Sequence, residues 1–429
     1  MALLLLLVTG CAMVLTPAYS QAQQLYFPPT TDTLWETVSF SELGWCPEHT
    51  DTLYSFLEAT NSKAFIVLKN GRIAIEWYGT DFSVNKNWYW ASAAKTITAV
   101  LVGMLNQDGT LDITRPTSDY LGSGWTSLPA EQEQNITLWH QLTMTTGLDD
   151  DVEDVDCTLP SCLTYKAEPG TRWAYHNAAY TMLHKVIEAA SDQKVNTILN
   201  ERLKSKTGMD GLFINSGYNN VMYSTARSMA RFGLLTLANF TWNGQTVFSD
   251  SNYIRSMLNT SQPLNKSYGY LWWLNGKESF MVPRTQFVFK GSAVPNAPAD
   301  MVSGLGTNNQ VVSVIPSMNM VVVRMGNNAG DAESENSLVF VNNLWSTLRL
   351  VMCSSTAVQA DESGHRYDFL VGQRTVPAGT RVVVVNVLGR TVGCFEGPDS
   401  VPESLSNAAI SVSNVTGATR VPTVYMLVR

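Results

Sequence analysis

The chain has 429 residues, of which 45% are hydrophobic and 15% are charged, and its formal net charge is −8. A chain of this length and apolar content can bury the core of one large domain and a smaller one, which excludes a largely disordered protein. The acidic balance and the lack of a Lys/Arg-rich stripe exclude the electrostatic footprint of a nucleic-acid-binding protein, so we expect no nucleic-acid partner.

The first 22 residues predict a signal peptide. An apolar run from Met1 to Val14 is too short to span a bilayer, and small residues follow it around Ser20 and Ala22, as in segments removed on export. Val8-Thr-Gly-Cys11 is typical instead of lipoprotein processing, and because no Lys or Arg precedes the apolar run, a plain N-terminal helix is a further alternative. We expect a periplasmic, cell-surface or secreted protein, in contact with a membrane only if Cys11 is lipidated.

Five cysteines follow Cys11, and an odd number leaves at least one of them unpaired. They are Cys46, Cys157, Cys162, Cys353 and Cys394. Cys157 and Cys162 bracket a short loop that a local disulfide would close in an oxidising compartment. No CxxC pair or Cys/His spacing indicates zinc, and we expect neither a metal nor a cofactor.

Strand and helix signals begin in the first third of the chain. Residues 64–68 and 72–77 are strand-like runs on either side of Asn70-Gly71, a dipeptide typical of tight hairpins. From Ser92 to about residue 105, apolar residues recur at helical spacing, with Gly109 beyond the end. We therefore expect two antiparallel strands and then a helix that begins near Ser92.

The middle of the chain, roughly residues 138–258, predicts a helical region inserted between strands. Helical patterns cover residues 180–190 and 225–238. Strand signals then return, followed by a last helical stretch; these segments are 268–273, 310–315 and 320–325 for the strands and 335–350 for the helix. One sheet built from both ends of this region is expected.

The character of the chain changes after Cys353. Short strand-like runs over 380–387, 410–413 and 424–428 are separated by Gly, Pro and Ser, which predicts a small all-β appendage. We divide the chain into a signal peptide (1–22), a main domain (23–352) and a C-terminal β-rich domain (353–429). The last domain loosely resembles the C-terminal sorting domains of some Bacteroidetes-type bacteria, and an adhesive or carbohydrate-binding module is the alternative.

The helix that begins near Ser92 carries a Ser-x-x-Lys motif, Ser92-Ala-Ala-Lys95. Three residues along a helix place both side chains on one face, where the amine can reach the hydroxyl. A serine hydroxyl needs a neighbouring base to become a nucleophile, and a desolvated lysine can supply one. An isolated match of this kind is more typical of a helix start with a solvated Lys than of a catalytic site.

Two further motifs follow in order and favour a catalytic site. Tyr175-His-Asn177 is the first, and Ser303-Gly-Leu-Gly-Thr307 precedes a strand as the second. A tyrosine whose pKa is lowered by Lys95 would take the proton of Ser92 and pass it to the leaving group, while Asn177 would hold Lys95 and a substrate amide. A core aromatic and a turn residue are the plainer alternatives for these two positions.

With these motifs the sequence resembles the serine hydrolases related to class C β-lactamases and penicillin-binding proteins, a family marked by Ser-x-x-Lys, Tyr-x-Asn and a Lys-Thr-Gly-type motif. It is most similar to the esterase and 6-aminohexanoate-dimer-hydrolase-like branch, through segments 142–148, 225–235 and 268–273. The resemblance implies an α/β (α+β) fold, a β-lactamase/transpeptidase-like antiparallel sheet flanked by helices with a helical subdomain. It also implies Ser92 as nucleophile, Lys95 and Tyr175 as the base system and Asn177 as a substrate-positioning residue.

The third motif departs from the family pattern, since its usual Lys or His falls on Gly304, within Gly304-Leu-Gly306. That cation normally helps to bind a substrate carboxylate, so its loss favours a neutral ester or amide, or a peptide-like substrate, over β-lactams. The backbone N–H groups of Ser92 and Thr307 remain candidate oxyanion donors, with Gly304 and Gly306 beside the substrate. The alternatives are β-lactamase or DD-peptidase-type activity and a non-catalytic penicillin-sensor-like or surface-binding protein.

Three other features have alternative interpretations. The acidic run over residues 149–156 predicts a solvated loop near the site rather than a cation site. His176 is a candidate substrate contact, although a lone His is more often a packed or surface residue. Five tryptophans would line an apolar cleft or pack in the core: Trp88, Trp90, Trp173, Trp272 and Trp273.

Overall fold

The computed structural model describes residues 25–31, 33–330 and 337–354, together with four strands after residue 380. The predicted signal peptide, with Cys11, Ser20 and Ala22, lies outside the described residues. None of the helices in the described part of the chain is long and apolar enough to cross a membrane.

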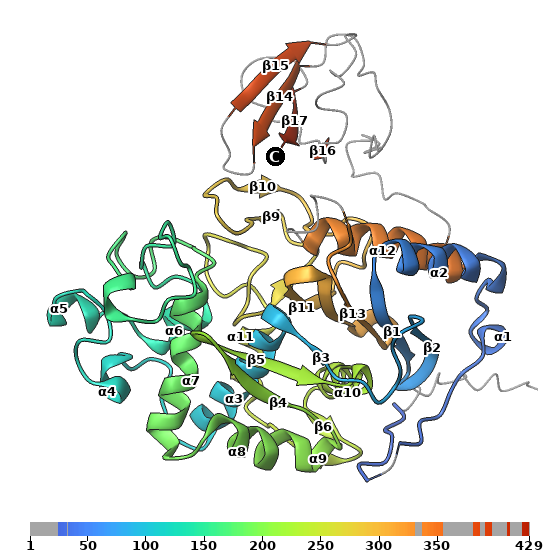
Figure 1. Cartoon of the computed structure of the whole chain (residues 1–429), viewed down its shortest axis with the longest axis horizontal. Coiled ribbons are helices and arrows are strands. Elements are labelled where there is room, and N and C mark those ends of the chain that lie inside the picture. Colours follow the sequence, from blue (N-terminus) through green and yellow to red (C-terminus); the bar gives the residue numbers. More distant parts are fainter. Residues whose placement is uncertain are drawn as a thin grey trace, which may run out of the picture.

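The main part of the molecule is built on a six-stranded antiparallel sheet in the order β2-β1-β13-β12-β11-β8 (Figure 1). Its strands are β1 (Ser62–Lys69), β2 (Arg72–Tyr78), β8 (Trp273–Leu274), β11 (Val302–Gly306), β12 (Gln310–Ile315) and β13 (Met320–Gly326). β1 pairs with β2 through the predicted hairpin and with β13 from the far end of the region. The sheet predicted from both ends of the chain is therefore confirmed.

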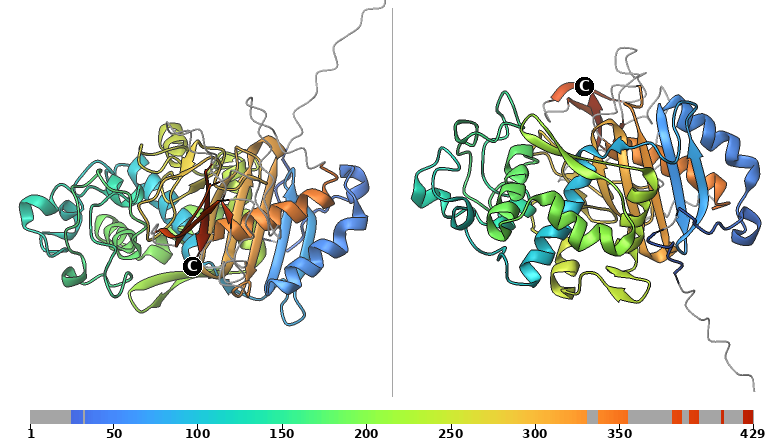
Figure 2. Two further views of the ribbon diagram at one scale, coloured as in Figure 1. Left: turned by 90° about the horizontal axis from the view of Figure 1, so that it is seen from above. Right: turned by 60° about the horizontal axis from the view of Figure 1, so that its bottom comes forward.

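Helices cover the sheet and explain why its central strands are buried along their whole length. Every residue of β12 and β13 is buried, as expected of strands covered on both faces. α10 (Ala226–Leu237) packs on β12 and β13, where a Cβ on Gly233 would lie 2.4 Å from Val321 Cγ1, so only glycine allows this approach. α2 (Thr50–Ala59) packs on β1, and α12 (Ser337–Val351) lies beside α2 (Figure 2).

A helical region lies between β2 and β8 in the sequence, as predicted. Its helices are α3 (Lys95–Gln107), α4 (Ser118–Leu121), α5 (Ala130–Glu133), α6 (Leu138–Leu142), α7 (Asn177–Ser191), α8 (Val195–Leu199), α9 (Ser205–Thr207) and α11 (Ser251–Met257). A small sheet in the order β3-β5-β4 joins this region to the turn before α3; its strands are β3 (Trp88–Tyr89), β4 (Leu212–Ser216) and β5 (Asn219–Ser224). Other short elements include α1 (Phe40–Leu43) and the pairs β6 (Thr241–Trp242) with β7 (Gln245–Thr246) and β9 (Ser279–Phe280) with β10 (Phe289–Lys290).

The strand expected over residues 268–273 is wrong. Of this segment only Trp273 belongs to a strand, β8. The rest folds back on itself, since Tyr268 bridges to Trp273 and Leu271 has a positive φ of 60°. The rings of this segment are buried, which gives it the apolar pattern of a strand without the extended backbone.

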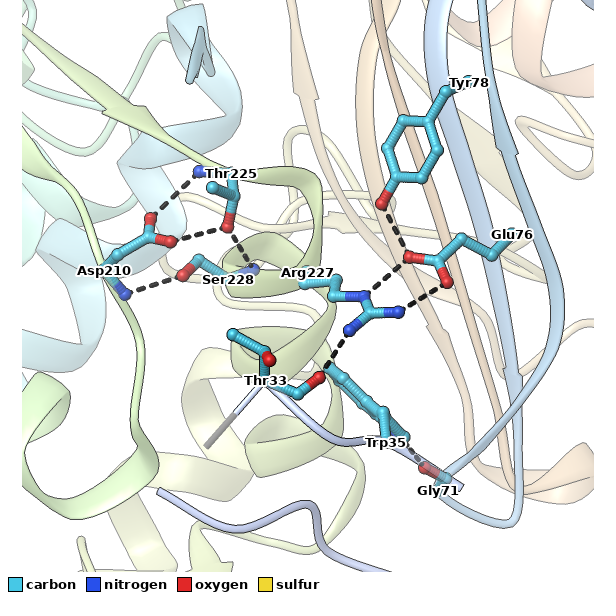
Figure 3. Close-up of polar contacts among 9 residues, drawn as sticks. All are labelled: Thr33, Trp35, Gly71, Glu76, Tyr78, Asp210, Thr225, Arg227 and Ser228. Carbon is cyan, nitrogen blue, oxygen red and sulfur yellow. Dashed lines mark hydrogen bonds and ion pairs between the residues drawn. The ribbon is translucent and has the colours of Figure 1, made fainter. Parts of the chain in front are cut away.

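An arginine on α10 ties that helix to β2 and to the N-terminal segment (Figure 3). Arg227 Nε and Nη2 each donate to the Glu76 carboxylate at 2.7 Å, and Nη1 donates to the Thr33 carbonyl at 2.6 Å. The Tyr78 hydroxyl donates to the same carboxylate at 2.6 Å. This two-pronged pairing fixes geometry as well as charge, and it explains why a segment before the first strand stays on the surface of α10.

The N-terminus of α10 is capped by Thr225, whose hydroxyl accepts from Ser228 N at 3.2 Å (Figure 3). Asp210 in turn accepts from Thr225 N at 2.9 Å and from its hydroxyl at 2.6 Å. Such caps satisfy amides that the first helical turn leaves unpaired. The segment 225–235 is thus held in place by the cap at Thr225 and by the contacts of the Arg227 side chain.

Two disulfides occur in the described residues. Cys157 bonds to Cys162, which confirms the predicted local bridge, and Cys46 bonds to Cys353, 307 residues away in sequence. The second bridge joins the segment before α2 to the end of α12. Cys353, assigned by the predicted division to the C-terminal domain, is therefore bonded to the main part.

Four strands follow residue 380 and form a sheet of their own in the order β15-β14-β17-β16. They are β14 (Arg381–Asn386), β15 (Thr391–Glu396), β16 (Ile410–Ser411) and β17 (Thr423–Val428). Three match the predicted runs and β15 does not. β14 and β17 pair in parallel, and the other two pairs are antiparallel.

Candidate active site

Ser92 lies in a tight turn between the small sheet and the helix that carries Lys95. The 3₁₀ turn η2 (Ala91–Ala94) precedes α3, so the helix begins three residues later than predicted. Trp90 anchors the turn to β5, because its amide donates to Met222 O at 2.8 Å and its indole to Ser224 Oγ at 2.7 Å. Ala91 has a left-handed φ of 46°, a conformation that costs a non-glycine residue about 1–3 kcal/mol and is often found at functional sites.

Lys95 is the centre of the polar contacts. Its Nζ donates to Ser92 Oγ and to Asn177 Oδ1, each at 2.8 Å, and the side chain is only 2% exposed. The ammonium nitrogen also lies 4.0 Å from the centre of the Tyr180 ring and 4.9 Å from that of Tyr175. The sequence motifs separated by 82 residues are therefore brought together at one nitrogen.

Burial lowers the pKa of Lys95 to about 7, while the negative charge of Asp156 acts in the opposite direction. Removing an ammonium from water disfavours its charged form. A substantial fraction of Lys95 is then neutral near pH 7 and has a lone pair with which to accept the Ser92 proton.

Tyr175 lies two residues before the first residue of α7, close enough to Ser92 for the serine side chain to act on its pKa. Its ring stacks on Trp273 at 5.9 Å and meets the edge of Tyr268 at 6.2 Å. Burial among these rings raises the pKa of Tyr175 more than the Ser92 side chain lowers it. The expectation that Lys95 would lower this pKa is wrong, because desolvation of a phenolate is the larger effect; Tyr175 is a neutral phenol and a proton donor.

β11 runs past the Ser92 turn so closely that it has no room for side chains on that face. A Cβ on Gly306 would lie 2.4 Å from Trp90 O and 3.0 Å from Ser92 N, and one on Gly304 would lie 2.9 Å from Ala93 O. Glycine is rare inside strands, which is why this strand was not predicted, and close backbone approach is the physical reason for its use here. Gly304 supplies no cation for a substrate carboxylate. Thr307 comes directly after the last residue of β11.

The turn after β11 is held in an unusual conformation. η5 (Thr307–Asn309) contains two consecutive left-handed residues, Asn308 at φ 60° and Asn309 at φ 58°. The Asn308 side chain donates to the Tyr89 hydroxyl at 2.7 Å, and Gln310 Nε2 donates to Thr307 O at 3.3 Å and Asn308 O at 3.1 Å. Sequence reasoning assigned no role to Tyr89, three residues before Ser92, or to Gln310, at the start of β12.

His176 is only 1% exposed, and neither ring nitrogen has a hydrogen-bond partner among the described residues. Burial lowers the pKa of His176 against the opposing charges of Asp150 and Asp149, so the ring is neutral near pH 7. Its side chain lies inside the protein rather than on the surface that Ser92 and Tyr175 reach. A contact between His176 and substrate stays a prediction.

The acidic run is packed more closely than a solvated loop. Asp150 pairs with Arg172 at 2.7 Å and its side chain is 8% exposed, and Asp149 pairs with Lys166 at 3.3 Å. Val155 O accepts from Ala178 N at 3.0 Å, which ties the loop to the start of α7. This attachment brings the next residue, Asp156, close enough for its charge to act on Lys95.

Four of the five candidate cleft tryptophans belong to the core. Trp90, Trp173 and Trp272 are at most 1% exposed and Trp273 is 7% exposed. Trp173 and Trp273 pack edge to face at 6.1 Å and enclose Tyr175. Their contribution to the site is to desolvate and orient Tyr175.

Known proteins of similar structure include one named as a 6-aminohexanoate-dimer hydrolase, from Bacillus anthracis, with 18% identity and a TM-score of 0.56 over 76% of this chain and 89% of that one. A penicillin-binding protein from Bacillus halodurans has 16% identity and a TM-score of 0.52 over 68% of this chain and 99% of that one. A hydrolase with promiscuous acyltransferase activity has 11% identity and a TM-score of 0.52 over 72% and 98% of the two chains. At these identities the likeness shows a shared fold.

No match was found among curated proteins. The family model described as Beta-lactamase matches residues 56–341, more than half of the chain. This segment contains Ser92, Lys95, Tyr175, Asn177 and the whole of β11. The match and the antiparallel sheet flanked by helices agree, and the chain belongs to the β-lactamase family.

Proposed function

We propose that the protein is a serine hydrolase that cleaves an ester or amide through an acyl-Ser92 intermediate. The observation that carries the proposal is the position of Lys95 Nζ, 2.8 Å from both Ser92 Oγ and Asn177 Oδ1, in a site where burial brings its pKa to about 7. A base that is partly neutral at the working pH and in contact with the nucleophile meets the requirements for activating a serine.

In the first half of the reaction Ser92 Oγ attacks the carbonyl carbon and its proton passes to neutral Lys95. The tetrahedral oxyanion accepts hydrogen bonds from the amides of Ser92 and Thr307. When the bond to the leaving group breaks, Tyr175 gives its proton to the leaving oxygen or nitrogen and regains one from the Lys95 ammonium. The products of this half are the free alcohol or amine and the acyl-enzyme, with Lys95 neutral again.

In the second half a water molecule replaces the leaving group. It gives its proton to the same Lys95 and Tyr175 system as its oxygen attacks the acyl carbon, and the proton returns to Ser92 Oγ as the acid leaves. Asn177 holds Lys95 through its amide oxygen, which leaves the amide NH₂ for a substrate carbonyl.

The substrate class we propose is a neutral ester or amide. The face of β11 beside Ser92 has Gly304 and Gly306 and supplies no cation for a carboxylate. The relatives named as a 6-aminohexanoate-dimer hydrolase and as a hydrolase with acyltransferase activity support acyl transfer outside β-lactams. β-Lactamase or DD-peptidase-type activity is the alternative, which the relative named as a penicillin-binding protein favours.

We further propose that the protein is exported and that the region after residue 353 is a separate β-rich unit. Two disulfides support an oxidising compartment, and the separate four-stranded sheet supports the division. A chain shortened to residue 354 keeps the Cys46–Cys353 bridge. Retained hydrolysis with lost export would support sorting, lost binding to cells or glycans would support adhesion, and lost hydrolysis would contradict the division.

The test of the proposed function compares the wild type with Ser92→Ala. Both are treated with a fluorophosphonate and assayed with p-nitrophenyl esters, short amides and a chromogenic cephalosporin. We expect labelling and ester or amide turnover in the wild type alone, with the cephalosporin untouched. Equal turnover in both would exclude Ser92 as nucleophile, and preferred cephalosporin turnover would support the β-lactamase alternative.

A further inference from the structure

The described part of the chain contains a buried arginine whose hydrogen bonds go to uncharged oxygens. Arg324, in the middle of β13, is fully buried. Its Nε donates to Ser62 Oγ at 2.9 Å, and its Nη2 donates to Thr60 O at 2.6 Å and Asn327 O at 3.0 Å. Burying a guanidinium without a carboxylate is costly, so its position calls for a physical reason.

The remaining donors of Arg324 point to the turn that follows β11. Nη1 donates to Asn308 O at 2.6 Å and to Asn309 O at 3.1 Å. These are the two left-handed residues of η5, and they come directly after Thr307. Asparagine adopts the left-handed conformation more readily than most non-glycine residues, but normally as a single residue, so two in succession require outside support.

Gln310 completes the support from the other side. Its Nε2 donates to Gly326 O at 2.6 Å and its Oε1 accepts from Gly326 N at 3.0 Å, in addition to the contacts with Thr307 O and Asn308 O. The turn is thereby attached to β13 at Arg324 and at Gly326. Phe340 of α12 packs 4.9 Å from the guanidinium and covers it.

We infer that Arg324 is a positioning residue, which holds the Asn308–Asn309 turn in its left-handed form and so aims the Thr307 amide at the oxyanion. This inference depends on the proposed function, since it assigns Arg324 to the oxyanion side of that same site. The guanidinium touches neither Ser92 nor substrate, and its effect passes through the backbone. A misplacement of about 1 Å in such a donor is enough to cost about a hundredfold in rate.

The first test is hydrogen exchange on the full-length Arg324→Lys variant, with Arg231→Lys as the matched control. Arg231 is also buried and donates to backbone carbonyls, Thr207 O at 2.8 Å and Pro29 O at 2.9 Å, away from Ser92. We expect amide exchange over residues 306–310 to quicken at least about tenfold in Arg324→Lys, and exchange over α3 to stay unchanged. Equal exchange over 306–310 in Arg324→Lys and wild type would overturn the inference, and so would the same increase in Arg231→Lys.

The second test is kinetic and uses a rescue. Arg324→Lys should lower kcat for an ester about 10–100-fold with KM within about threefold, because only the transition state carries the oxyanion. Asn309→Gly added to Arg324→Lys should recover at least about tenfold, since glycine adopts positive φ without strain. A folded Arg324→Lys variant with wild-type kcat, or a double variant with no recovery, would contradict the inference.

If Arg324→Lys does not fold, Gln310→Met replaces it in both tests. Gln310→Met removes donors from the same turn and leaves Arg324 in place, and it should show the same exchange and kcat pattern, with unchanged exchange or kcat overturning the inference. Hydrogen exchange needs no enzymatic activity. A wild type without Ser92-dependent turnover would thus refute the proposed function, whereas unchanged exchange would refute the role of Arg324.

Discussion

The candidate site has two sides that are built in opposite ways. On the helical side, α3 and α7 present side chains that touch one another: Lys95 contacts Ser92 and Asn177 directly. On the strand side, β11 presents backbone, and glycine at 304 and 306 removes the side chains that would separate it from the Ser92 turn. The helical side is suited to moving a proton and the strand side to binding negative charge, and the two should respond differently to substitution.

The largest expected effect is on the helical side, at Lys95. Lys95→Ala removes the base. Lys95→Arg introduces a guanidinium, which stays protonated near neutral pH and therefore cannot accept the Ser92 proton. We expect both to lower kcat/KM for an ester by about 10³–10⁴-fold, measured by initial rates. Lys185→Ala, at an exposed position on the far part of α7, is the control. If Lys95→Arg kept more than a tenth of the activity, proton acceptance by Lys95 would be refuted.

Tyr175→Phe should have the next largest effect. The change removes the phenolic proton but keeps the ring stacked on Trp273, and we expect kcat for an amide to fall about 10²–10³-fold. Esters with a good leaving group should lose less, because p-nitrophenolate leaves without a proton. Tyr180→Phe is matched to it, since that ring also faces Lys95, at 4.0 Å. Equal losses in both variants would show that the effect is not specific to the Tyr175 hydroxyl and would contradict its role as proton donor.

A smaller effect is expected on the strand side, from Gly306→Ala. The new methyl group would lie 2.4 Å from Trp90 O, so β11 must move away from the Ser92 amide, and we expect kcat to fall about a hundredfold. Thermal unfolding should show a loss of about 1–3 kcal/mol from overpacking. Thr307→Ala, which changes an exposed side chain and keeps the amide, should retain most activity. A fully active Gly306→Ala would exclude close approach as the reason for glycine.

The smallest effect is a shift of the pH profile in Asp156→Asn. Burial lowers the pKa of Lys95 to about 7, and the charge of Asp156 raises it. Because the neutral amine is the active form, log kcat/KM should rise with pH up to about 7 and then level off. Removing the Asp156 charge lowers the pKa of Lys95 further, so the rising limb should move to lower pH with a plateau within about threefold of wild type. A limb that moved to higher pH would contradict this assignment.

The helical side could be predicted from the sequence and most of the strand side could not. Ser92 and Lys95 occur in a motif whose spacing follows from helix geometry, Tyr175 and Asn177 occur in a second short motif, and the structure brings all four together. The glycines of β11 lower its strand propensity, so the sequence does not predict the strand, whereas the close approach of its backbone to η2 decides the outcome. Arg324 and Gln310 carry no local signal, since their partners lie at distant or backbone positions.

The same distinction applies to the pKa of Tyr175 and to residues 268–273. The sequence shows that Lys95 and Tyr175 share a site. It does not show how far Trp273 and Tyr268 exclude water from the phenol, and this burial decides that the pKa of Tyr175 is raised rather than lowered. Likewise, aromatic residues over 268–273 fit a strand pattern while the backbone turns at Leu271. Both errors come from tertiary burial, which local patterns do not encode.

An acyl-enzyme on Ser92 can be detected by intact-mass analysis and peptide mapping of wild-type enzyme quenched with acid during turnover of a p-nitrophenyl ester. We expect a mass increase equal to the acyl group, located on the peptide that contains Ser92 and absent from Ser92→Ala. An acyl group on another residue, or undiminished acylation and turnover in Ser92→Ala, would contradict it.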